Sequence, residues 1–254
     1  MTLWTPTHVQ TLLPAIIVML VIALVLRKTL GKKDRKIRMI PFQFFSCVLV
    51  LLEIGKQAIS FKNGYDLYHI PLHFCSLFIF ALPAMAFYRG KHANQVKTVT
   101  TTLCMAVTGL MLIFPNIIYS PGNVDGFFKS YLDFHTVAFH NLVICAFVLI
   151  MGLKVYAPEE TGEKKAVLLA IVGFCAVAAS AAHILKVNFA NFYSCNVGPL
   201  DAVRISLQSV LGVFLTQVLY VSIIASLHIG FVWGCYQLLR TVRKRISKAE
   251  KAAV

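Results

Sequence analysis

Long apolar stretches alternate with short polar segments along the whole chain. A helix that crosses a hydrocarbon core of about 30 Å needs about 20 apolar residues, and each stretch is near that length. The last one is too long for a single straight crossing, so we expect it to tilt or to extend into the membrane interface. The pattern predicts an all-α polytopic membrane protein of about seven transmembrane helices, which form one domain over residues 1–254. The expected spans are Leu12–Leu26, Ile40–Ser60, Ile70–Tyr88, Val99–Ile118, Tyr131–Leu153, Ala166–Leu185 and Ile205–Leu239.

The composition excludes a soluble domain. Hydrophobic residues make up 58% of the 254 positions and charged residues only 13%, about half of what a soluble domain carries. The net charge of +14 could suggest nucleic acid as a partner, but the basic residues stand at the ends of apolar stretches and form no nucleic-acid motif. We therefore expect membrane lipids as partners and no nucleic acid.

The distribution of lysine and arginine predicts the orientation. The segments 27–39, 89–98, 154–165 and 240–254 would lie on one side of the membrane, and they hold 19 of the 24 basic residues. Because basic loops stay on the cytoplasmic side, we expect the N-terminus outside and the C-terminus in the cytoplasm.

Ionisable and polar side chains inside predicted spans are costly and therefore call for a reason. Glu53 and Lys56 are i,i+3 neighbours and are expected to neutralise each other on one helix face, which favours a structural role. Most of the others fall in the outer half of the bilayer, roughly 5–14 Å below the outer ends of their spans. They are His73, Cys75, His135, His140 and His183, followed by Asn188 and Asn191 in the next outer loop. This layer is the predicted functional site.

The spacing of these residues does not favour a metal or a cofactor. His135 and His140 lie about 140° apart around a helix, and His73 and Cys75 about 200° apart, so neither pair forms a local ligand set. Only one of His73 and Cys75 can easily face a cavity. Two hypotheses follow: Cys75 acts as a nucleophile with a histidine as its base, or His73 alone carries out acid–base chemistry.

Several sequence strings resemble those of the YwaF-type bacterial integral membrane family. They are HIPLHFC at 69–75, FPN at 114–116, FHTVAFH at 134–140 and the polar stretch 188–196. That family is similar to the transmembrane protein 164 family, which is implicated in acyl transfer to lysophospholipids through a cysteine and a histidine. The polar stretch departs from the family pattern where Cys195-Asn196-Val197-Gly198 interrupts it.

The resemblance implies a membrane-embedded lipid acyltransferase or acyl-ester hydrolase that acts on a phospholipid or lysophospholipid. Cys75 would accept the acyl group and His140 would be its general base, although His135 is the other candidate for the base. The residues that would support the reaction or bind substrate are His73, His135, His183, Asn188, Asn191 and Asn116. Transfer and hydrolysis stay open, because both use the same nucleophile and base.

The residues alone leave two further hypotheses of function open. The polar layer could be the pocket of a transporter or binding protein for a small molecule or lipid, or the chain could be a scaffold subunit. A multispan chain without a glycosylation sequon fits a bacterial cytoplasmic membrane, and we expect that location.

Overall fold

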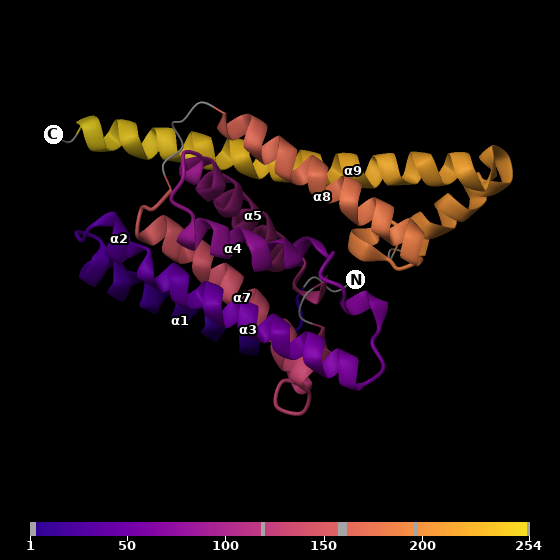
Figure 1. Ribbon diagram of the computed structural model, residues 1–254, viewed down its shortest axis with the longest axis horizontal. Coiled ribbons are helices and arrows are strands. Elements are labelled where there is room, and N and C mark those ends of the chain that lie inside the picture. Colours follow the sequence, from indigo (N-terminus) through magenta and orange to yellow (C-terminus); the bar gives the residue numbers. More distant parts are fainter. Residues whose placement is uncertain (1–3, 118–119, 157–161, 196–197, 253–254) are drawn as a thin grey trace.

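The computed structural model describes residues 4–117, 120–156, 162–195 and 198–252, and regular structure within them is entirely helical (Figure 1). The expected end of the fourth span at Ile118 and the asparagine at 196 lie outside the described residues. The α-helices are α1 (Pro6–Leu30), α2 (Arg35–Arg38), α3 (Ile40–Lys62), α4 (Phe78–Phe87), α5 (Ala93–Ile113), α6 (Pro121–Asp125), α7 (Tyr131–Gly152), α8 (Glu163–Leu185) and α9 (Gly198–Ala252). The 3-10 turns are η1 (Leu67–His69), η2 (Phe74–Leu77), η3 (Pro115–Ile117) and η4 (Phe189–Asn191).

Six helices of the described chain are long and apolar enough to cross a membrane, and the stretch Phe74–Phe87 adds a shorter apolar helix. The protein is therefore an all-α polytopic membrane protein, as the hydrophobic pattern predicts.

The third predicted span is not one regular helix. The expected segment Ile70–Tyr88 begins with extended backbone, continues as the turn η2, and becomes α-helical only at Phe78. Pro71 accounts for the extended backbone at the beginning of this segment, because the proline ring keeps the preceding Ile70 out of the helical region. As a result, Cys75 lies in a 3-10 turn rather than in a regular helix.

The last predicted span is broken. The expected segment Ile205–Leu239 lies inside α9, but Gly212 has φ 77° and ψ 160°, outside the helical region. Glycine adopts such a conformation without steric cost. The chain therefore turns at Gly212, and Figure 1 shows a short arm before the turn and a long straight helix after it. Residues 205–211 belong to the arm, which corrects the expectation of one tilted crossing.

Helix α5 lies at the centre of the bundle, where it contacts α4, α7, α8 and α9. Its buried surface is rich in threonine, and three of these hydroxyls donate to carbonyl groups of the preceding turn: Thr100 to Val96, Thr101 to Lys97 and Thr102 to Thr98. Because these bonds stay within the helix, the hydroxyls can be buried without unsatisfied donors. The centre of this membrane protein can thus be closely packed and still carry polar side chains.

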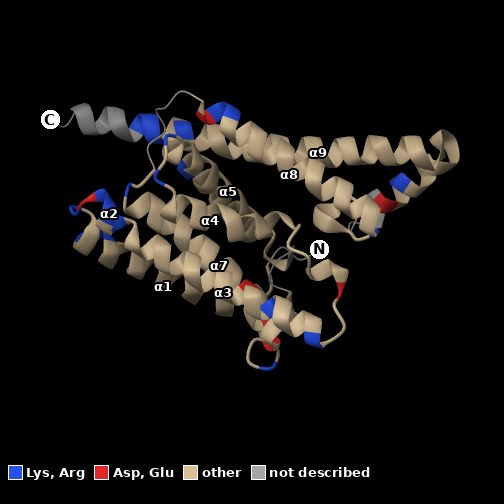
Figure 2. Cartoon of the chain, viewed as in Figure 1, with Lys and Arg blue, Asp and Glu red and all other residues tan. Residues whose placement is uncertain are grey.

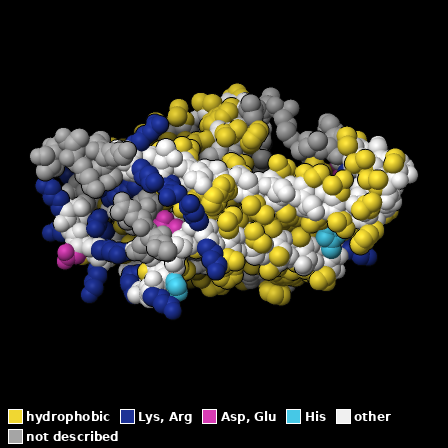
Figure 3. All heavy atoms as spheres, turned by 90° about the horizontal axis from the view of Figure 1, so that it is seen from above, with side chains coloured by type: hydrophobic (Ala, Val, Ile, Leu, Met, Phe, Trp, Pro, Cys, Tyr) yellow, Lys and Arg dark blue, Asp and Glu magenta, His cyan; other side chains and the backbone are white. Residues whose placement is uncertain are grey.

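Apolar side chains are exposed along the outside of the bundle. Figure 3 shows hydrophobic atoms along the length of the visible face. On α1 and α9 the exposed residues include Leu13, Val21, Leu24, Val213, Phe214 and Leu227. An exposed apolar surface of this extent is unusual for a soluble monomer and is what contact with lipid requires.

The charged side chains mark the two ends of the bundle. In Figure 2, lysine and arginine gather at the end that holds α2, the turn after α4 and the last part of α9. These are three of the four segments expected to share one side of the membrane, and the fourth, 154–165, is only partly described. The side of the membrane that this end faces stays a prediction.

Candidate functional site

An ion cluster joins α3 to α7. The Glu53 carboxylate, only 6% exposed, accepts from Lys56 Nζ at 2.7 Å through Oε1 and from His135 Nε2 at 3.1 Å through Oε2. The expected pairing of Glu53 with Lys56 is therefore present. His135 is an addition that the sequence does not indicate, because it stands 82 residues away on another helix.

Gln57 extends this cluster toward the loop after α3. Its amide Nε2 donates to Glu53 Oε1 at 2.7 Å and to the carbonyl of His69 at 2.8 Å, and its Oε1 accepts from Tyr65 Oη at 2.7 Å. Sequence reasoning missed Gln57. The signal that could have found it is its position four residues after Glu53, on the same face of an apolar helix.

His140 lies one and a half turns further along α7 and is buried. Its Nδ1 is 2.6 Å from the carbonyl oxygen of Thr136, and since a carbonyl only accepts, Nδ1 must carry the proton. In the neutral ring Nε2 is then unprotonated. His140 is thus held in the tautomer that a general base needs.

Cys75 is partly exposed, and His73 is located two residues earlier, before η2 begins. His73 Nε2 donates to the carbonyl of Tyr68 at 3.1 Å, and its ring lies 4.3 Å from that of Tyr68 and 5.5 Å from that of Phe189. His73 therefore has its side chain fixed between the loop after α3 and the turn η4.

The charge of Lys56 connects these groups. Its ammonium lies within electrostatic range of Cys75, His73 and His140, although burial is the larger influence on each of them. Cys75 also interacts with Glu53, and His140 with His135. Of the four predicted residues of spans three and five, His135 bonds directly to the ion pair on α3, and Cys75, His73 and His140 lie within its electrostatic range.

The remaining predicted residues lie apart from this ion pair. His183 is 3.4 Å from Gln217 Nε2, between α8 and α9. The Oδ1 atom of Asn188 accepts from the backbone N–H groups of Tyr193 and Ser194, which shapes the outer loop. Asn191 and Asn116 lie in the turns η4 and η3, and the Oδ1 of Asn191 is buried without a hydrogen-bond partner among the described residues. The loop of Asn188 and Asn191 adjoins His73 through the contact of Phe189 with the His73 ring.

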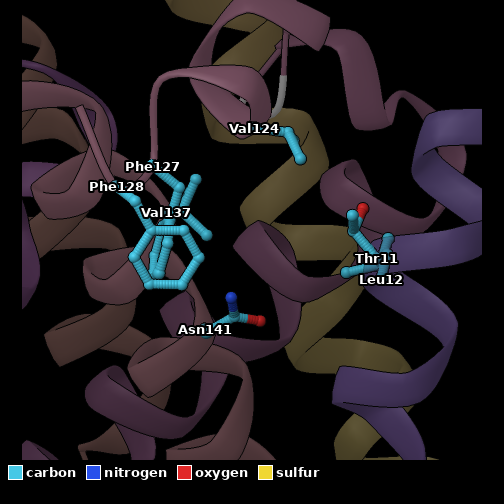
Figure 4. A pocket seen from close by; sticks show the side chains of 7 residues that line it. All are labelled: Thr11, Leu12, Val124, Phe127, Phe128, Val137 and Asn141. Atoms are coloured by element: carbon cyan, nitrogen blue, oxygen red, sulfur yellow. The ribbon is translucent and has the colours of Figure 1, made fainter. Parts of the chain in front are cut away.

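An apolar pocket of about 280 Å³ opens beside α7 (Figure 4). It is lined by Thr11, Leu12, Val124, Phe127, Phe128, Val137 and Asn141. Figure 4 shows Thr11 and Leu12 of α1 across from the α7 residues. The Oδ1 of Asn141, the residue after His140, is buried without a hydrogen-bond partner in the described part of the chain. Among the described residues of the chain, no three His, Cys, Asp or Glu side chains lie together in a way that could hold a metal ion.

Comparison with known proteins bears on the identity of this site. The model of the TMEM164 family matches residues 3–233, which span all the candidate residues. Neither the comparison with curated proteins nor that with solved structures finds a match. The family match confirms the resemblance drawn from the strings around Cys75 and His140. Because the match covers nearly the whole chain, this protein belongs to the TMEM164 family.

Proposed function

We propose that this protein transfers or hydrolyses an acyl ester of a phospholipid or lysophospholipid inside the membrane, with Cys75 as nucleophile and His140 as general base. The observation that carries the proposal is that Cys75 and His140, which stand on separate segments of the chain, both lie within electrostatic range of Lys56 in the Glu53–Lys56 ion pair. Because the thiol of Cys75 lies in a buried setting, its proton has to pass to a base as the sulfur attacks. A nucleophile, a base and a cation near one another are the parts that acyl transfer through a thioester requires.

The reaction would proceed in two balanced steps. The sulfur of Cys75 attacks the ester carbonyl carbon while its proton passes to Nε2 of His140, and the ester C–O bond then breaks. The leaving alkoxide takes this proton from Nε2 of His140, and the acyl group stays on Cys75 as a thioester. A lysolipid hydroxyl or water, deprotonated by His140, then attacks the thioester and restores the thiol. The oxyanion of each step would be stabilised by the nearby ammonium of Lys56.

The site's place in the bundle fits a lipid substrate. Cys75 lies in η2 and is separated from Tyr88 at the basic end by the rest of this turn and by α4, a distance of roughly 20 Å along the chain axis, which is a depth that a membrane-dissolved ester can reach. The apolar pocket beside α7 lies at the level of His140 and offers a space for an acyl chain. We also propose that this half of the bundle faces outward and that the protein resides in a bacterial cytoplasmic membrane.

The test uses the full-length protein in liposomes with a labelled phospholipid and an unlabelled lysophospholipid. Acyl transfer and free fatty acid are followed together, and the protein is analysed by mass spectrometry before and after hydroxylamine, which cleaves thioesters. Cys75→Ala is expected to abolish both products, and His140→Gln to slow them by about 10²–10⁴-fold. Cys235→Ala is the matched control, because this cysteine has similar exposure but stands on α9.

Full activity in a folded Cys75→Ala variant would show that the mechanism is wrong. A second outcome is that the wild-type protein forms no adduct and changes no lipid but binds lipid in stoichiometric amount. In that case the hypothesis of a lipid-binding protein or transporter replaces that of an enzyme. Thermal unfolding of each variant separates loss of chemistry from loss of fold.

A further inference from the structure

A second pocket, of about 470 Å³, lies at the basic end of the bundle. It is formed by α2, by the turn after α4 and by the first turns of α5. Five of the residues that line it are cationic: Arg35, Lys36, Arg89, Lys91 and Lys97. None of its described lining residues is acidic. The four exposed cations around this cavity, Arg35, Lys36, Arg89 and Lys91, repel one another, and an anion in the cavity would offset that repulsion.

Hydrogen bonds hold the two exposed arginines of the pocket. The Arg35 guanidinium donates from Nη2 to Asn94 Oδ1 at 2.6 Å, which ties α2 to α5. Arg89 donates from Nη2 to the carbonyl of Ala86 at 2.7 Å, at the end of α4. Lys97 reaches the pocket from within α5 and is only 4% exposed. Three separate segments of the chain therefore hold their cations toward one space.

The turn between α4 and α5 is also shaped for this arrangement. The ring of Tyr88 lies so close to Gly90 that a side chain at position 90 would meet Tyr88 Cζ at 2.5 Å. Glycine thus allows the tyrosine to fold over the turn while Arg89 and Lys91 remain directed to the pocket. Tyrosine is also typical of the membrane–water interface, where its ring meets acyl chains and its hydroxyl meets headgroups.

We propose that this pocket binds the headgroup of an anionic phospholipid. Apolar surface next to the pocket supports a lipid rather than a soluble phosphate. Ile40 follows the lining residue Met39 and is 55% exposed, and Phe87 precedes Tyr88 and is 51% exposed. Acyl chains could lie against these side chains while the phosphate meets the arginines, which bind phosphate through two parallel hydrogen bonds. Basic pockets between helices on the cytoplasmic side are known sites for anionic headgroups.

The experiment must separate this pocket from the general positive charge of the same end. The full-length protein in detergent is titrated with phosphatidylglycerol and with phosphatidylcholine, and bound lipid is counted by native mass spectrometry. The pocket variant is Arg35→Gln with Arg89→Gln. The matched control is Lys244→Gln with Arg245→Gln, which removes two exposed cations from the end of α9 that do not line the pocket. Both variants lose the same net charge.

A cation near an anionic headgroup is worth about 1 kcal/mol, or about fivefold in affinity. The pocket variant is therefore expected to bind phosphatidylglycerol about 25-fold more weakly, with phosphatidylcholine binding unchanged and the control variant within about twofold of wild type. An equal loss in both variants would overturn the proposal in favour of a general surface field. A wild-type protein without preference for phosphatidylglycerol would also overturn it. Displacement of the lipid by soluble glycerol phosphate at a similar concentration would show that the ligand is a free phosphate.

This proposal does not depend on the acyl chemistry at Cys75, because lipid binding is measured without turnover. The Cys75→Ala variant should retain the full preference for phosphatidylglycerol. Failure of one proposal therefore leaves the other standing.

Discussion

Removal of the Glu53 carboxylate is the most informative single change to this fold. The carboxylate accepts from three side chains, Lys56 and Gln57 on its own helix and His135 on α7. Glu53→Ala would leave the Lys56 ammonium in a mostly buried position without its anion, and it would remove the bond to His135, one of the contacts between α3 and α7. Loss of one partner of a buried ion pair typically costs about 3–5 kcal/mol. For a chain of this size that corresponds to a fall in Tm on the order of 10 °C.

The assay is thermal unfolding of the purified variants in one detergent at one protein concentration. Glu53→Gln should be less destabilised than Glu53→Ala, because the amide keeps the shape and part of the hydrogen bonding. Adding Lys56→Met to Glu53→Gln should recover stability, since the double variant no longer buries an unpaired charge. A coupling of about 0.5–3 kcal/mol between the two positions is expected.

Asp201 and Arg204 provide the matched control, because they form an ion pair of the same i,i+3 spacing and the same 2.7 Å length but with more exposed side chains. Solvent screens such a pair, so Asp201→Ala should change Tm much less than Glu53→Ala. Equal effects of the two substitutions would refute the reasoning that burial of the Glu53 cluster sets its energy. A stable Glu53→Ala variant whose α3–α7 contact persists would refute it as well.

Three further predictions follow from the packing of the helices. Gly55→Ala should lower the free energy of unfolding by about 1–3 kcal/mol, because the new methyl group would overlap Oη of Tyr131, lie 2.6 Å from its Cζ and push this ring off α3. Adding Tyr131→Phe should relieve the clash only in part, because the close contact with Cζ remains, and chemical denaturation measures both. Gly212→Ala should cost about 1–3 kcal/mol at the bend of α9, and an unchanged Tm would show that the bend is not held in this conformation. Asn141→Leu should leave Tm unchanged or raise it, because the substitution removes a buried oxygen without a partner, and a clear fall in Tm would indicate that this oxygen is satisfied in the membrane.

The all-α membrane fold of this protein could largely be predicted from the sequence. Apolar stretches and the basic segments between them are local properties, because each segment partitions between water and lipid by its own composition. The all-α membrane fold and the gathering of basic residues at one end follow from them. The pairing of Glu53 with Lys56 was likewise predictable, since side chains three positions apart on a helix are neighbours regardless of the rest of the chain.

Only the tertiary structure decides how the polar layer is arranged. His135 bonds to Glu53 because of the way α7 is rotated against α3, and the same rotation decides where the unprotonated Nε2 of His140 lies. No local sequence pattern fixes this rotation. Likewise, the depth of Cys75 depends on the extended segment after Pro71, and the basic pocket on the meeting of α2 with the start of α5. Hydropathy determines which segments enter the membrane, but lipid is equally apolar around every span. Packing and hydrogen bonding between helices therefore decide which faces meet, and these depend on residues far apart in the chain.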